Sequence, residues 1–176
     1  AAFARRRSSA LRRAACGGGA LSLNLLAPDG CSFSEQYQDF PKVAAGHPVT
    51  ATEKGGGVTD GEVIDEYPAT AHCQWSGAAE PYTFSGSFLL RSVGVRRAAS
   101  FGSRIALGQP DDGSMLLSSD ELPAQYAGSC AFTPIELDVA THSVWVSFTC
   151  GTFKDPDGDT CAVGPSYYYF ENCTAP

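Results

Sequence analysis

The sequence predicts a single all-β domain, an antiparallel β-sandwich or, alternatively, a β-barrel, stapled by disulfide bonds. Three observations predict this fold class. One segment has the residue pattern of a β-hairpin that brings two cysteines together. Short strand-like runs recur at intervals of about ten residues, with turn signals between them and no long helical period. Seven cysteines are present in 176 residues, and no two have the C-x-x-C spacing of a zinc ribbon or a thioredoxin-type redox site.

The hairpin lies between Cys130 and Cys150. If its turn is centred at Ala140, Cys130 faces Cys150 and Phe132 faces Phe148 across the two strands. The even-numbered positions then form one apolar face, made of Cys130, Phe132, Pro134, Val144, Val146, Phe148 and Cys150. The odd-numbered positions are mostly polar, with the exceptions of Ile135, Leu137 and Trp145. A single register therefore satisfies the alternation of a half-buried hairpin and places two sulfur atoms side by side.

The other elements follow from local patterns in chain order. A capping-box spacing between Ser32 and Glu35 predicts a short helix over 32–39, which Pro41 ends. A weak strand is expected over 48–53. Strand-like runs then cover 61–66, 70–75, 81–95, 99–107, 113–118, 129–137, 143–153 and 166–173, and a single helical turn is expected over 119–127.

The cysteine count predicts an oxidised protein. Seven is odd, and Cys16 lies in an arginine-rich head, so six cysteines remain for pairing: Cys31, Cys73, Cys130, Cys150, Cys161 and Cys173. Six cysteines allow fifteen connectivities, and the sequence does not choose among them. Our interpretation pairs Cys130 with Cys150 and Cys161 with Cys173, which leaves Cys31 for Cys73. Wide, irregular spacings of this kind are typical of extracellular, periplasmic or cell-envelope proteins.

Residues 1–29 differ from the rest and are interpreted as a disordered, basic, export-signal-like leader, with the β domain over 30–176. Arginines precede a small-residue stretch and the apolar run 20–27, which is the order of a secretory signal. The paired arginines also resemble a twin-arginine signal. A third interpretation takes 13–17 as a lipobox, with Cys16 as a lipid anchor. No run reaches the roughly 18 apolar residues of a membrane span.

The charge excludes one class of partner. The net charge is −7, and five of the twelve basic residues lie in the first 13 positions, so the remainder of the chain is more acidic still. A nucleic-acid binder needs a basic surface that releases counterions from phosphates. We therefore expect no nucleic-acid partner, and a glycan or a cell-surface protein instead.

An acidic turn is a candidate calcium site. Asp155, Asp157 and Asp159 alternate along a loop, and calcium prefers several hard oxygen ligands on a flexible loop. The sixth and twelfth positions of an EF-hand loop would be Thr160 and Ser166, so that motif is incomplete. The alternative is a polar turn in which the aspartates bond their own backbone.

The aromatic residues near the C-terminus are a candidate ligand platform. Alternation along a strand sends Tyr167 and Tyr169 to one face and Tyr168 to the other. Together with Trp145 or Trp75 on the solvent side, Tyr167 and Tyr169 could stack against sugar rings. The alternative is that these aromatic residues only pack in the core or at a sheet edge.

The hairpin also resembles a known group of domains. A strand that ends in Leu137-Asp138, a short turn and a strand that ends in Ser-Phe-Thr-Cys150 are similar to small β-sandwich domains of bacterial exported or envelope proteins of unknown function. This resemblance implies an exported β domain and carries no activity with it.

Three functions are compatible with these observations. The first is a secreted or envelope-associated, non-catalytic β domain with a structural or ligand-binding role. The second is a carbohydrate-binding module that uses the aromatic residues and calcium. The third is a hydrolase whose catalytic carboxylates the sequence does not single out among its nineteen acidic residues. No nucleophile motif such as G-x-S-x-G is present.

Overall fold

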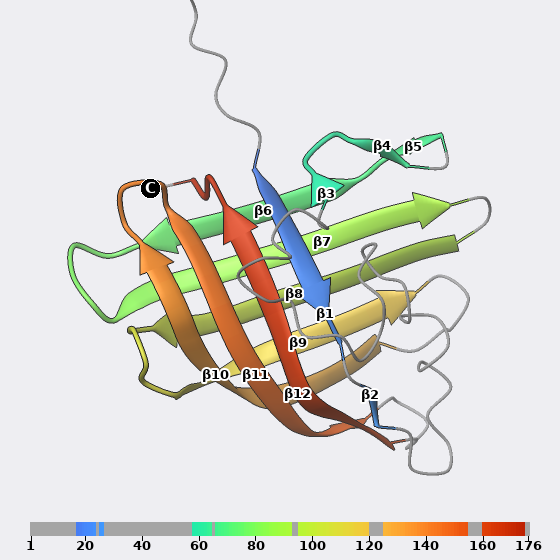
Figure 1. Cartoon of the computed structure of the whole chain (residues 1–176). Helices are drawn as coiled ribbons and strands as arrows, with labels where there is room; N and C mark the ends of the chain where they lie inside the picture. Colours follow the sequence, from blue (N-terminus) through green and yellow to red (C-terminus); the bar gives the residue numbers. More distant parts are fainter. Residues whose placement is uncertain are drawn as a thin grey trace, which may run out of the picture.

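The computed structural model describes residues 17–23, 25–26, 58–64, 66–92, 95–119, 125–154 and 160–174 (Figure 1). All of these residues lie in β-strands or in the connections between strands, so the all-β prediction is confirmed. Within them, no helix exists that could span a membrane.

Most strands belong to one antiparallel sheet. In chain order the strands are β1 (Gly18–Ser22), β2 (Leu25–Leu26), β3 (Val58–Thr59), β4 (Val63–Ile64), β5 (Tyr67–Pro68), β6 (Thr70–Ser76), β7 (Tyr82–Ser92), β8 (Val95–Ile105), β9 (Asp111–Ser119), β10 (Gln125–Asp138), β11 (Ser143–Lys154) and β12 (Thr160–Glu171). The order across the ten-stranded sheet is β3-β1-β12-β11-β10-β9-β8-β7-β6, and β2 pairs with β12. β4 and β5 form a separate small ribbon.

The sheet folds over itself into two layers. Strands β6 to β9 run crosswise behind β1, β11 and β12, and the long strand β10 passes from one layer to the other (Figure 1). The layers face each other as in a sandwich, but the sheet is continuous and nearly closed. It therefore approaches the barrel that the sequence left as the alternative.

Alternation along the strands builds the core between the layers. In β6, Ala71, Cys73 and Trp75 are buried, while His72 and Gln74 face outward. The centre of the core is the fully buried ring of Tyr168. Aromatic rings from both layers surround it at centroid distances of 4.8 to 6.0 Å: Phe84, Phe101, Phe132, Phe148 and Phe170. Such a cluster buries a large apolar area and locks the layers together.

The predicted hairpin is confirmed, including its register. Cys130 pairs with Cys150, Phe132 with Phe148 and Pro134 with Val146. A β-bulge then shifts the register by one residue at Ile135, so that Asp138 rather than Leu137 pairs with Ser143. The turn itself covers 139–142, and His142 adopts a left-handed backbone conformation there.

The bulge explains two of the exceptions in the alternation. Ile135 is the extra residue, and its side chain is 43% exposed. After the shift, Leu137 lies opposite Val144 and packs against the core. Ile135 and Leu137 therefore point to opposite sides of the sheet.

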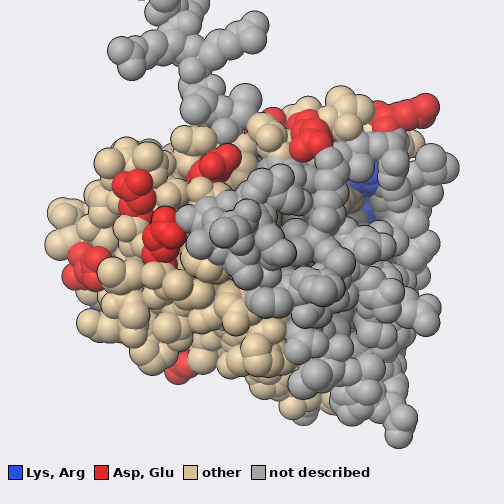
Figure 2. All heavy atoms as spheres, viewed as in Figure 1, with Lys and Arg blue, Asp and Glu red and all other residues tan. Residues whose placement is uncertain are grey.

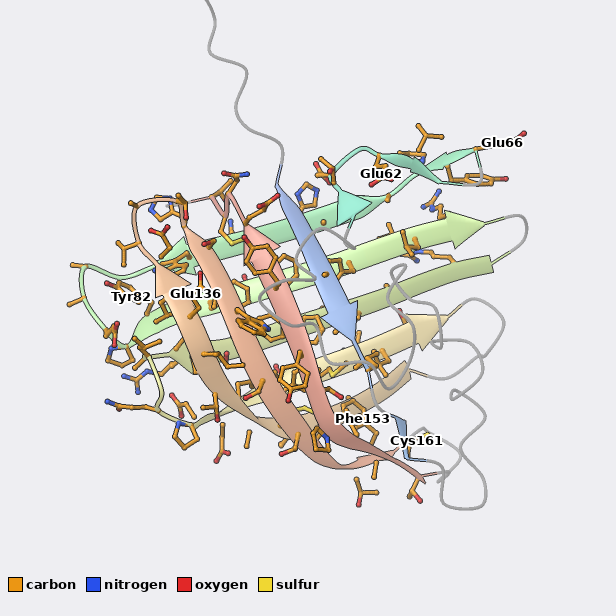
Figure 3. The ribbon with its side chains drawn as sticks, in the orientation of Figure 1. Glu62, Glu66, Tyr82, Glu136, Phe153 and Cys161 are labelled. Atoms are coloured by element: carbon orange, nitrogen blue, oxygen red, sulfur yellow. A yellow bond between two sulfur atoms is a disulfide. The ribbon has the colours of Figure 1, made fainter. Side chains whose placement is uncertain are left out.

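The disulfide bonds correct part of the predicted pairing. Cys130 and Cys150 are bonded as predicted. Cys73 is bonded to Cys173, so the predicted pairs Cys161–Cys173 and Cys31–Cys73 are wrong. Cys161 and Cys173 flank the length of a single strand, β12, and in Figure 3 Cys161 lies at the end of β12 that is far from the C-terminus. A β-strand rises by roughly 3.3 Å per residue, so the sulfur atoms of Cys161 and Cys173 lie tens of ångströms apart. Cys161 is disulfide-bonded, and its partner lies outside the described residues, as do Cys16 and Cys31.

Part of the apolar run 20–27 belongs to the sheet, in β1 and β2. β1 pairs with β12 over its whole length, and Leu21 and Leu23 are almost completely buried in the core. Strands β1 and β2 of the predicted leader thus belong to the sheet, and the interpretation of the leader as an export signal stays a prediction. The rest of the predicted leader, including the lipid-anchor candidate Cys16, lies outside the described residues.

Three further predictions concern short elements. The helix over 32–39 and the strand over 48–53 lie outside the described residues. The helical turn over 119–127 is wrong at both ends, because Ser119 belongs to β9 and Gln125–Asp138 is β10.

Candidate ligand-binding face

The outer side of the layer formed by β10, β11 and β12 carries the predicted aromatic residues. Along β12, Tyr168 and Phe170 point into the core and are 0% exposed. Tyr167 and Tyr169 therefore project from the other side. Tyr169 packs there against Ala20 of β1, and it is 9% exposed.

The sheet register brings the third aromatic residue to the same place. Trp145 of β11 lies directly opposite Tyr169 of β12, and Tyr167 lies opposite Ser147. Trp145 and Tyr167 are both partly buried and pack against the cluster of Ala20 and Tyr169. We call the surface of Trp145, Tyr167 and Tyr169 the aromatic face. Trp75, the alternative candidate, is a core residue that is 3% exposed and packs against Tyr82.

Two carboxylates lie at one end of the aromatic face. Glu136 is paired with Trp145 across β10 and β11, and Glu171 follows Tyr169 by two residues on β12. The hydroxyl of Tyr169 donates a hydrogen bond to the Glu171 carboxylate at 3.3 Å. Both glutamates are exposed, and Figure 3 shows Glu136 projecting from the strand layer.

The carboxylates affect the ionisation of the tyrosine between them. Burial raises the pKa of Tyr169 above its ordinary value, and the negative charge of Glu171, with a smaller effect from Glu136, raises it further. The phenol therefore remains a hydrogen-bond donor at neutral pH. Its donated bond orients one side of the Glu171 carboxylate and leaves acceptor positions on that carboxylate for a ligand.

A hollow lies at the other end of the aromatic face. It has a volume of about 220 Å³ and is lined by Ala131, Thr133, Ser147, Phe148, Thr149, Pro165 and Tyr167. Its hydroxyl groups come from neighbouring strands, since Thr133 of β10 pairs with Ser147 of β11. The Ser147 hydroxyl donates to the carbonyl of Thr133 at 3.2 Å. The ring of Tyr167 thus borders both the aromatic face and a polar depression.

A second hollow lies on the outer side of the opposite layer. Its volume is about 280 Å³, and its lining includes His72, Gln74, Ser85, Ser87 and Ser100. Nε2 of His72 is 3.6 Å from a carboxylate oxygen of Asp60. The outward side chains of this hollow can form hydrogen bonds, but the predicted aromatic residues are on the other layer.

The calcium candidates Asp155, Asp157 and Asp159 lie outside the described residues. Within the described ranges, His, Cys, Asp and Glu side chains form no group of three or more that could hold a metal ion. The calcium site therefore stays a prediction.

The sequence reasoning missed Glu136 and the hydroxyl groups of the hollow. Strict alternation from Cys130 would place Glu136 on the apolar face, and only the bulge at Ile135 turns it outward beside Trp145. A charged residue at an apparent core position was the available signal that the register changes there.

No family model matches the chain, and the comparisons find no similar curated protein and no similar solved structure.

Proposed function

We propose that this protein is an extracytoplasmic, non-catalytic domain that binds a glycan on its aromatic face. One observation carries the proposal: the partly buried rings of Trp145 and Tyr167 pack around Tyr169 on the outer side of one layer, next to a hollow with hydroxyl groups. A sugar offers the matching chemistry, because its ring has apolar C–H faces and a polar rim of hydroxyls. Ligand sites commonly combine aromatic surface with a few placed polar groups.

The disulfide bonds support a location outside the cytosol. Two bonds join described cysteines, and a third involves Cys161. Disulfides persist in oxidising compartments and are rare in the cytosol. A secreted or envelope-associated location is the proposal that fits them, and it agrees with the resemblance of the hairpin to exported β-sandwich domains.

The absence of catalysis is part of the proposal. A glycoside hydrolase holds two carboxyl groups on either side of the bond that it cleaves, usually in a concave site. The carboxylates beside the aromatic face, Glu136 and Glu171, are exposed on the surface of a strand layer. We therefore expect binding without turnover, and a reducing-end assay on every glycan that binds tests this expectation.

A glycan array followed by calorimetry tests the binding. We expect Trp145→Ala and Tyr167→Ala each to weaken binding of the selected glycan by about fivefold, because each removes a stacking surface worth about 1 kcal/mol. Tyr67→Ala is the matched control, since Tyr67 is a 37% exposed tyrosine on the separate ribbon of β4 and β5. Unfolding midpoints establish that all three variants are folded.

Calcium is tested in the same experiment. The array is run with calcium and with a chelator, because Asp155, Asp157 and Asp159 remain candidate ligands. If no glycan binds under either condition, the proposed function is wrong.

A further inference from the structure

We infer that the ligand of the aromatic face is a cationic glycan, a chain of amino sugars with free amines. This inference rests on the proposed function and specifies the chemistry of its ligand. It is carried by the position of the carboxylates relative to the aromatic rings and by the distribution of charge over this side of the molecule.

The charged side chains around the aromatic face are mainly acidic. Glu136, Asp138 and Glu171 lie toward the end of the layer where β10 turns into β11, and Figure 2 shows acidic side chains of described residues there. Among the described residues of β1, β10, β11 and β12, only Lys154 is basic, and it lies at the opposite end of β11. With a net charge of −7 for the whole chain, the surface is complementary to a positive ligand.

Each carboxylate is next to an aromatic side chain. Glu136, Trp145 and Tyr169 form one row across three neighbouring strands, because Glu136 pairs with Trp145 and Trp145 pairs with Tyr169. Glu171 accepts the hydrogen bond of the Tyr169 hydroxyl. An ammonium group over the Trp145 ring would gain a cation–π interaction and a charged hydrogen bond to a glutamate at the same time.

The hollow favours a sugar over another polycation. Thr133, Ser147 and Thr149 offer hydroxyl groups near the ring of Tyr167. The hydroxyls of a sugar can pair with these groups while its ring stacks on the tyrosine. A lysine-rich peptide would satisfy the carboxylates but would bring aliphatic side chains to this polar depression. The whole surface, from carboxylates through rings to hydroxyls, matches an amino sugar best.

The test compares two oligosaccharides that differ only in the acetyl group. Calorimetry on the whole protein measures binding of β-1,4-linked hexamers of glucosamine and of N-acetylglucosamine in a mildly acidic, low-salt buffer. We expect the glucosamine hexamer to bind about tenfold more tightly, and we expect this preference to shrink with added salt and above the pKa of the amines.

Charge-neutralising variants assign the preference to the site. Glu136→Gln and Glu171→Gln should each reduce glucosamine affinity severalfold and leave the affinity for the acetylated hexamer unchanged. Glutamine at 171 can still accept from Tyr169, so the aromatic face keeps its geometry. Glu66→Gln makes the same charge change at an exposed position beside the separate ribbon of β4 and β5 and should have no effect.

The outcomes separate this inference from the proposed function. Equal binding of the two hexamers, or a preference unaffected at Glu136 and Glu171, overturns the inference and leaves glycan binding in place. No binding of any glycan overturns both. Poly-lysine is the last comparison. If it competes with the glucosamine hexamer at equal affinity, and if Glu136→Gln and Glu171→Gln weaken its binding too, the face binds basic polymers in general and the amino-sugar assignment is overturned.

Discussion

At the scale of a single residue, Asp138 organises the turn between β10 and β11. Its carboxylate accepts hydrogen bonds from the backbone N–H groups of Ala140 at 2.9 Å and Thr141 at 3.3 Å. The hydroxyl and backbone N–H of Thr141, followed by the backbone N–H of Ala140, lower the pKa of Asp138 below its ordinary value of 3.8. A lowered pKa in the folded state means that the ionised side chain stabilises the fold above pH 3.8, and that this contribution is lost as the pH falls through the folded value.

Two substitutions at Asp138 separate the hydrogen bonds from the charge. We expect Asp138→Ala to lower the unfolding midpoint at neutral pH, and we expect its difference from the parent protein to shrink at pH values below 3.8. Asp138→Asn keeps an acceptor for the turn, so it should lose less stability and show a weaker pH dependence. Thermal unfolding followed by circular dichroism from neutral to strongly acidic pH measures both. A constant gap for Asp138→Ala over that range contradicts the argument.

Gly86 is required for steric reasons. A Cβ atom at Gly86 would lie 2.5 Å from Cε2 of Phe170, whose ring is fully buried between the layers. We expect Gly86→Ala to cost about 1–3 kcal/mol, because the Phe170 ring can move only by displacing other packed rings. Equilibrium unfolding in denaturant measures this cost.

Gly102 on the neighbouring strand is the matched control. A Cβ atom there would meet only the Ser114 hydroxyl, at 3.5 Å, which is an ordinary contact. Gly102→Ala should therefore be neutral or slightly stabilising, since alanine restricts the unfolded chain. Equal losses for the two variants would show that glycine flexibility, rather than space for Phe170, decides the effect.

At the scale of the elements, the alternation of apolar and polar residues predicted those strands that have one buried and one exposed face. In β6, buried Cys73 and Trp75 alternate with exposed His72 and Gln74, so the pattern was legible without the rest of the chain. β1 was missed because its segment Gly-Gly-Ala offers almost no side-chain signal. The need for glycine at position 19 depends on residues far along the chain, because a Cβ atom there would lie 2.5 Å from the backbone carbonyl oxygen of Tyr169 and 2.9 Å from the rings of Phe88 and Phe170.

The candidate site was likewise predictable only where the pattern of a single strand decides the position of a side chain. The common side of Tyr167 and Tyr169 follows from the period of a single strand. The outward position of Glu136 depends on a bulge, which the sequence marks only as a break in the pattern. The hollow beside Tyr167 depends on three strands at once, so no local pattern describes it.

At the scale of the whole molecule, the C-terminal segment docks onto the edge strand β6. β6 ends the strand order on one side, and the residues after β12 return to it. The N–H of Trp75 donates to the carbonyl of Thr174, and the N–H of Thr174 donates to the carbonyl of Cys73, both at 3.0 Å. The Cys73–Cys173 disulfide fastens this contact across a sequence separation of 100 residues. An unpaired edge strand can pair with other chains, so the docked segment also protects β6.

The two described disulfides should contribute unequally to stability. The Cys130–Cys150 bond closes a loop with a separation of 20 residues within one hairpin, whereas Cys73–Cys173 closes one of 100. If restriction of the unfolded chain dominates, replacing both cysteines of a pair by serine costs about 3 kcal/mol for the hairpin bond and about 5 kcal/mol for the long loop. Denaturant unfolding of the two double variants measures the losses, and hydrogen exchange locates them.

The long-loop variant should lose amide protection at Trp75 and Thr174, because the hydrogen bonds of these residues depend on the docked C-terminal segment. The hairpin variant should keep that protection. A larger loss for the hairpin pair, or unchanged protection at Trp75 in the long-loop variant, would show that the C-terminal segment stays docked on β6 without the sulfur bond.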